Sequence, residues 1–145
     1  MVAAPTSTHP TPTIGGVHHV AITVRDLDAS VAFYERLLGV GPVAELAGEG
    51  LRRRLFALPG GTNLGLTQHD RGVDGDFSPF RPGLDHLGLG VASRDDLVAW
   101  VAHLDAVGIA HDGIVDVDYG SAISIKDPDG TALEVAEEIA RMSAV

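Results

Sequence analysis

The chain has 145 residues and a net charge of −10, with twenty Asp and Glu against ten Lys and Arg, and it contains no cysteine. An acidic surface repels phosphate backbones and argues against nucleic-acid binding, while the absence of thiols excludes disulfides and thiolate metal sites. No apolar stretch approaches the roughly 18 residues of a membrane span, and the N-terminus has no signal-peptide pattern. We therefore expect one folded domain, located in the cytoplasm.

Composition divides the chain into five segments. The first is rich in Pro, Thr, Ser and Ala without a period, which is typical of disorder. Two longer segments each begin with a strand-like run, and a polar Gly- and Pro-bearing stretch separates them. The expected boundaries are a disordered leader over 1–14, a first module over 15–70, a linker over 71–83, a second module over 84–136 and a C-terminal tail over 137–145.

The first module begins with a strand over residues 17–24, which are rich in β-branched side chains. A helix follows, with Asp26 or Asp28 as its N-cap and Gly39 just past its last turn. Residues 41–68 have the composition of three short strands, broken by Gly- and Pro-containing turns.

The second module repeats this order. A strand is expected over residues 84–91, and Ser93 with Asp96 forms a capping-box-like helix start. Gly108 ends the helix. Further strands are expected around 109–117, 122–126 and 131–136.

An internal repeat relates the two modules. An offset of 67 residues pairs His19 with His86, and after a two-residue insertion an offset of 69 pairs Gly61 with Gly130. The chain is therefore two copies of a strand–helix–three-strand unit. The predicted fold is α+β, with two tandem βαβββ modules that form a curled mixed β-sheet around a cleft and carry their helices outside.

The stretch 127–134 has the strongest local signal. Asp127-Pro-Asp-Gly130 has the chemistry of a tight turn, and the strand after it carries Glu134 among apolar residues. A carboxylate there is costly to bury unless a cation, a hydrogen-bond donor or a metal accompanies it.

Two histidines are the candidate companions of Glu134. His19 and His86 hold equivalent positions in the first strand of each copy, so the pseudo-symmetry predicts that they face each other. Two imidazoles and one carboxylate with open positions form a facial triad for a divalent metal, and iron, manganese, zinc, nickel and cobalt all fit these ligands.

These motifs resemble the vicinal oxygen chelate superfamily, which includes glyoxalase I, extradiol dioxygenases, fosfomycin-resistance enzymes, methylmalonyl-CoA epimerase and bleomycin-resistance proteins. The resemblance covers residues 17 to about 136 and rests on the stretches 19–28, 33–39, 86–91 and 127–134. It implies paired βαβββ modules, assembly as a homodimer, and a metal held by His19, His86 and Glu134. In some members the ligands of one site come from two subunits, and the sequence leaves that open.

Departures from the subfamily patterns narrow the choice. The fourth ligand of glyoxalase I and the epimerase is missing, because the repeat places Gly65 opposite Glu134. Ser124 stands where extradiol dioxygenases carry a tyrosine, and Tyr119 and His111 are the candidate substitutes. The fosfomycin enzymes need a cationic pocket for their phosphonate substrate, and this acidic chain has only Lys126 near the expected site.

We predict a metal-dependent enzyme, a lyase, isomerase or dioxygenase, that chelates a small oxygenated substrate and stabilises an enolate- or catecholate-like intermediate. Glu134 and Tyr119 are the predicted catalytic residues. Phe56, Tyr119 and Phe77 are the predicted walls of the substrate pocket. The alternative function is a metal-free protein that sequesters a small molecule, as bleomycin-resistance proteins do.

The only basic run is Arg52-Arg53-Arg54. One interpretation is the charged face of an exposed strand, and the other is an anion-binding patch for a substrate.

Overall fold

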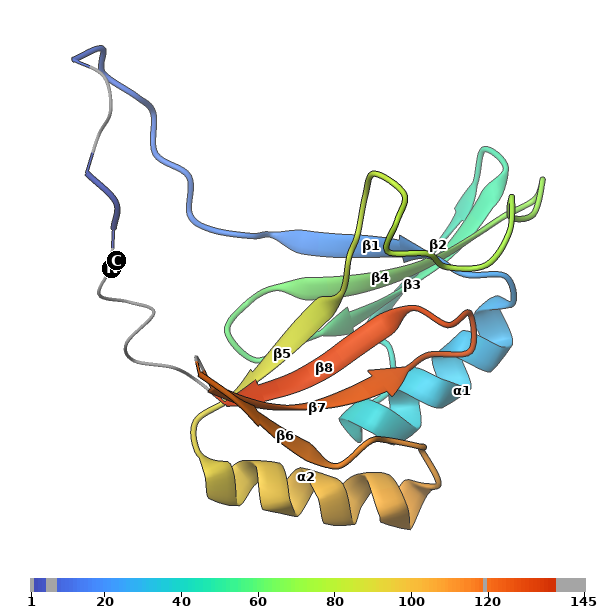
Figure 1. Cartoon of the computed structure of the whole chain (residues 1–145). Coiled ribbons are helices and arrows are strands. Elements are labelled where there is room, and N and C mark those ends of the chain that lie inside the picture. The colour runs from blue at the N-terminus through green and yellow to red at the C-terminus, as the bar shows by residue number, and fades with distance from the viewer. Residues whose placement is uncertain (1, 5–7, 119, 138–145) are drawn as a thin grey trace.

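The computed structural model describes residues 2–4, 8–118 and 120–137 (Figure 1). The first module contains β1 (His19–Thr23), α1 (Leu27–Leu38), β2 (Ala44–Gly48), β3 (Leu51–Ala57) and β4 (Asn63–His69). The second contains β5 (Leu87–Val91), α2 (Arg94–Val107), β6 (Ile114–Val117), β7 (Gly120–Lys126) and β8 (Ala132–Glu137).

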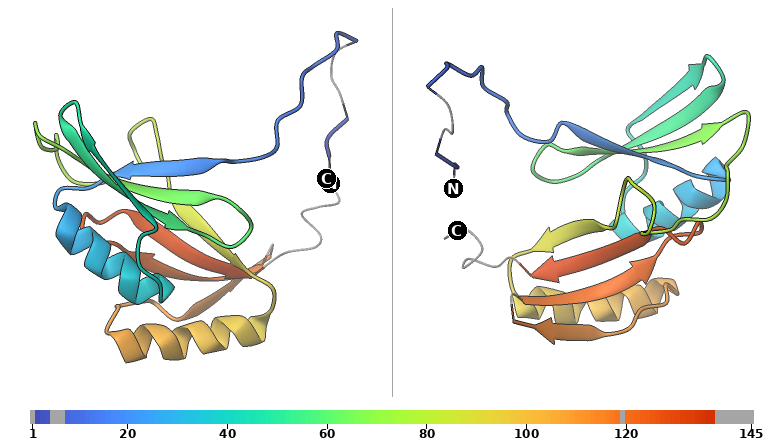
Figure 2. Two further views of the ribbon diagram at one scale, coloured as in Figure 1. Left: turned by 180° about the vertical axis from the view of Figure 1, so that it is seen from behind. Right: turned by 45° about the horizontal axis from the view of Figure 1, so that its top comes forward.

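Each module folds into its own four-stranded mixed sheet. The strand orders are β1-β4-β3-β2 and β5-β8-β7-β6, so the same topology occurs twice. In each sheet the first strand pairs in parallel with the last, and the other pairs are antiparallel. The sheets remain separate in both views of Figure 2. The predicted α+β fold with two tandem βαβββ modules is confirmed.

The helix ends follow the predicted local chemistry. Asp26 caps α1, since its Oδ1 accepts from the backbone N–H of Ala29 at 3.1 Å. Ser93 and Asp96 form a capping box at the start of α2. Gly39 and Gly108 end the helices with φ of 72° and 73°, a left-handed backbone that a side chain would disfavour.

The core lies between each sheet and its helix. Helix α1 contacts β3 and β4, and α2 contacts β6, β7 and β8. Phe56 of β3 belongs to this core, has no exposed surface and lies 6.3 Å from the ring of Tyr34, measured between centroids. The prediction that Phe56 lines the substrate pocket is therefore wrong, because its alternating position on β3 directs it to the helix.

The turn at 127–130 joins the second module to α1 of the first. The hydroxyl of Tyr34 donates to Oδ2 of Asp127 at 2.9 Å, and both side chains are buried. The other oxygen of Asp127 accepts from the backbone N–H groups of Asp129 and Thr131, each at 2.9 Å. Burial, followed by the charge of Asp127, raises the pKa of Tyr34 well above its ordinary value, so the phenol stays a donor.

Each sheet has a second face that its helix does not cover. Strand register places His19, Ala21 and Thr23 on this face of the first sheet, while the alternate residues of β1 point to the core. In the second sheet the same face carries Glu134, which pairs with Gly88 on one side and with Ser124 on the other. We call these surfaces the open faces of the two sheets.

No helix in the described ranges has both the length and the apolar character that a membrane crossing requires. Apart from Glu137, the predicted tail over 137–145 lies outside the described residues.

Candidate functional site

His86 and Glu134 lie together on the open face of the second sheet. His86 directly precedes β5, and Glu134 stands on β8, the parallel neighbour of β5. Nε2 of His86 is 3.4 Å from Oε1 of Glu134. Gly88 leaves the space beside the carboxylate open, since a Cβ there would lie 3.8 Å from Cγ and Oε1 of Glu134. The Glu134 side chain is 32% exposed, so it faces the open surface rather than the interior of the fold.

Asp85 is hydrogen-bonded to the other ring nitrogen of His86. Its Oδ2 lies 2.7 Å from Nδ1 of His86. The hydrogen bond to Asp85 raises the pKa of His86, the charge of Glu134 adds to this effect, and desolvation opposes it. A carboxylate on Nδ1 fixes the ring orientation and leaves Nε2 for a second partner, an arrangement typical of metal-ligating histidines.

The structure does not bring His19 to this pair. His19 is exposed, and its Nδ1 lies 2.9 Å from Nδ1 of the neighbouring His18, with the two rings nearly perpendicular. Over the described ranges, no group of three His, Asp or Glu side chains is placed to hold a metal ion within one chain. Of the three predicted ligands, two therefore converge.

A pocket of about 700 Å³ adjoins His86 and Glu134. Phe33 and Arg36 of α1 contribute to its wall, so helix and sheet of different modules meet there. Ser124 and Lys126 of β7 also line it and share the open face with Glu134. The pocket thus combines an aromatic ring, cations, a hydroxyl and the two candidate metal ligands.

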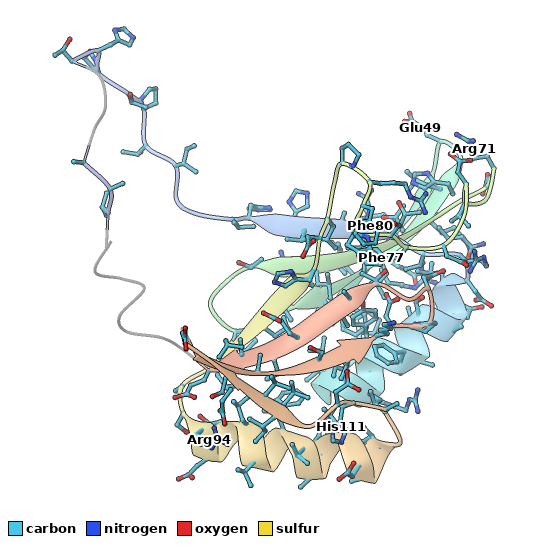
Figure 3. The ribbon with its side chains drawn as sticks, in the orientation of Figure 1. Glu49, Arg71, Phe77, Phe80, Arg94 and His111 are labelled. Atoms are coloured by element: carbon cyan, nitrogen blue, oxygen red, sulfur yellow. The ribbon has the colours of Figure 1, made fainter. Side chains whose placement is uncertain are left out.

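His111 lines the same pocket, but both of its ring nitrogens are engaged. Nδ1 accepts from the backbone N–H of Gly113 at 3.1 Å, so the ring proton lies on Nε2, which is 2.7 Å from Oδ1 of Asp105. In this arrangement His111 is a structural residue of the α2–β6 connection (Figure 3). Its use as a substitute acid or base would require these bonds to break.

The predicted aromatic walls lie elsewhere. Phe77 is partly buried in the linker and lines a different pocket of about 600 Å³, next to β1. Its neighbour Phe80 is 93% exposed, and Figure 3 shows both rings in the linker, away from His111. Tyr119, predicted as a catalytic and pocket residue, lies outside the described residues.

Asp85 is the site residue that sequence reasoning missed. In a regular strand adjacent residues point to opposite faces, which would separate Asp85 from His86. However, β5 begins only at Leu87, so the alternation does not extend to this pair. The sequence did contain a signal for this contact, because Asp85 directly precedes the candidate ligand His86 at the start of a predicted strand.

A sequence profile of the Glyoxalase/Bleomycin resistance protein/Dioxygenase superfamily matches residues 16–135. The chain belongs to this superfamily. The predicted resemblance to the vicinal oxygen chelate superfamily is thereby confirmed, and the paired βαβββ modules are its fold.

Solved structures of the superfamily give the same fold. A glyoxylase/bleomycin resistance protein/dioxygenase domain from Frankia sp. EAN1pec has 34% identity and a TM-score of 0.78, covering 86% of this chain and 98% of its own. Lactoylglutathione lyase from Agrobacterium tumefaciens has 22% identity and a TM-score of 0.66, covering 87% and 96%.

A more distant structure contains a metal. It is a mutant of the fosfomycin-resistance protein FosX from Listeria monocytogenes, complexed with Mn(II) and 1S,2S-dihydroxypropylphosphonic acid. Its identity is 15% and its TM-score 0.68, covering 92% of this chain and 100% of its own. At this identity the likeness shows the fold alone. No protein of curated function gives a significant sequence match to this superfamily member.

Proposed function

We propose that this superfamily member is a metal-dependent enzyme acting on a small oxygenated molecule, with His86, Glu134 and His19 as the metal ligands. The observation that carries the proposal is the His86–Glu134 pair with Asp85 behind it. A neutral imidazole and a carboxylate on neighbouring strands suit a divalent ion, and the FosX complex is an example of this fold with Mn(II).

Asp85, Glu134 and Ser124 have different roles at the proposed site. Asp85 orients the His86 ring so that Nε2 faces Glu134. Glu134 supplies negative charge, and Ser124 opposite it offers a hydroxyl to a bound molecule. A divalent ion held there would act as a Lewis acid that favours negative charge on substrate oxygens, which suits lyase, isomerase or dioxygenase chemistry.

A second copy of the chain completes the site in this proposal. Two ligands gather on the open face of the second sheet, while His19 stands exposed on the open face of the first. Within the described part of one chain the three do not meet. Association of two copies, open face to open face, supplies His19 from the partner and makes the enzyme a homodimer.

The test is the metal content of protein purified anaerobically without a metal-binding tag. The wild type is expected to hold about one divalent ion per chain. Glu134→Ala is expected to hold none, because the site loses its carboxylate. Glu137→Ala is the matched control: it removes a carboxylate from the same strand, but its odd position points to the other face, so the metal should remain.

A metal-free binding protein is the second candidate, and the separate position of His19 favours it. In that case the pocket beside His86 would sequester a small molecule without chemistry. No metal in the wild type, even after reconstitution with iron, manganese, zinc, nickel or cobalt, would overturn the enzyme proposal and leave this function.

A further inference from the structure

The three consecutive arginines of β3 divide between the two faces of the first sheet. Arg52 and Arg54 point to the side of the helix, where Arg54 pairs with Glu45 at 3.2 Å between Nη2 and Oε2. Arg53 points the other way, since it stands opposite Thr67 of β4, which stands opposite Thr23 of β1. Arg53 is therefore on the open face.

The Arg53 side chain is held in a defined place on that face. It is partly buried, and its Nε donates to Oγ1 of Thr67 at 2.7 Å. Its Cδ lies 3.4 Å from where a Cβ on Gly65 would stand, so its stem extends over the bare backbone of β4 toward the row of Ala21 and Leu55. His19 occupies the next row along the same face.

The stem of Arg53 passes over Gly65, which is the residue equivalent to Glu134 in the internal repeat. The repeat relates Gly65 to Glu134, so the first module has an arginine stem where the second has its carboxylate. The open face of the second sheet therefore has a carboxylate at this place, and the open face of the first has an arginine stem whose guanidinium lies beside Thr67.

The guanidinium of Arg53 differs from those of the other arginines in the described ranges, because it is partly buried and has no acidic partner. Arg25, Arg54, Arg71 and Arg94 each lie within 4.0 Å of a carboxylate. For Arg53 no such contact occurs within the described ranges, although the chain has twice as many acidic as basic residues. Arg36, Arg52 and Arg81 also lack a carboxylate partner there, but they are exposed, whereas Arg53 is partly buried. A partly buried cation without a counter-charge is costly, and a ligand anion would offset that cost.

We propose that Arg53 binds an oxyanion of the substrate, a carboxylate, phosphate or phosphonate. This inference rests on the proposed function and names its substrate class: a small oxygenated molecule that carries an anionic group as well as the oxygens directed to the metal. Arg53 is a binding and positioning residue. The anion-binding interpretation of the arginine run thus applies to one of its three members.

The experiment titrates metal-free protein, labelled with ¹⁵N, with inorganic phosphate and separately with acetate. The Nε–Hε resonance of Arg53 and the amides of Gly65 and Thr67 are followed. They are expected to shift with saturation, and Arg53→Gln should weaken the affinity about tenfold or more. Arg52→Gln is the matched control, because it removes the same charge from the adjacent residue on the other face and should leave the affinity unchanged.

Two further measurements distinguish lost anion binding from lost folding. Thermal unfolding of Arg53→Gln establishes that the variant is folded, and Arg53→Lys, which keeps the charge but loses the fork, should retain part of the affinity. Equal weakening by Arg52→Gln, or no saturable shift at Arg53 in the wild type, would overturn the proposal. Metal content is measured separately, on protein purified anaerobically before its metal is removed. If that preparation holds no metal even after reconstitution, while the metal-free protein still binds the anion saturably, only the enzyme proposal is overturned.

Discussion

At the scale of single residues, the site depends on which partner each ionisable group has. Asp85 orients His86, and both ring nitrogens of His111 have partners. Among the described residues, the side-chain partner of Arg53 is the Thr67 hydroxyl alone. His111 therefore serves the structure, whereas the guanidinium of Arg53 keeps nitrogens that a ligand can bind.

Asp129 provides a pH-dependent prediction at this scale. Burial raises its pKa, the nearby charges of Asp127 and Asp76 add to this effect, and Arg25 opposes it. A raised pKa in the folded state means that the contribution to stability is present below the ordinary value and is lost as the pH rises through the folded value.

We therefore expect Asp129→Asn to flatten the decline of stability between acidic and neutral pH. Its amide oxygen can still accept from the backbone N–H of Arg25, which Oδ1 of Asp129 now does at 3.0 Å. The measurement is urea unfolding of both proteins from about pH 3.5, near the ordinary carboxyl pKa, up to about pH 7. A variant that is less stable at neutral pH and has an unchanged slope would contradict the assignment.

At the scale of elements, the contact between α1 and the 127–130 turn is one of the bonds that join the two modules. Tyr34→Phe leaves Oδ2 of the buried Asp127 without its donor, so we expect a loss of roughly 1–3 kcal/mol in the free energy of unfolding, measured by urea denaturation.

The control for that prediction is Asp127→Asn. Its amide oxygen can still accept from the backbone N–H groups of the turn, and its NH₂ group can donate to the hydroxyl oxygen of Tyr34. It should cost less than Tyr34→Phe. Equal stability of wild type and Tyr34→Phe would show that the contact contributes nothing.

The elements also show how far sequence reasoning extends. Caps at Asp26 and Ser93, the left-handed glycines and the order of strands depend on neighbouring residues, and the sequence predicted them. The position of Phe56 depended on which face of β3 meets the helix, and the partner of Arg53 on strand register. Such distant pairings leave little trace in a local pattern.

At the scale of the whole molecule, the proposed site, with ligands from two chains, predicts complementation between variants. When His19→Ala and Glu134→Ala chains are mixed, a dimer of one of each retains one site in which all three ligands are intact. We expect about one metal ion per mixed dimer, purified through two different tags that do not bind metal, and none in either pure variant.

A mixed dimer without metal, alongside a wild type that binds it, would mean that each chain builds its own site. His18→Ala in place of His19→Ala is the matched control, since it removes the adjacent imidazole. Its pure form should keep about one ion per chain.

The hydrogen bond between Tyr34 of α1 and Asp127 of the turn also indicates how the fold changed after duplication. At the equivalent places in the other copy the repeat puts Val101 for Tyr34 and Leu58 for Asp127, so the contact was kept or acquired in only one direction after duplication. Because this bond passes through space rather than along the chain, a protease nick in the linker should leave the two fragments associated. The halves would then behave as a split protein whose parts recognise each other.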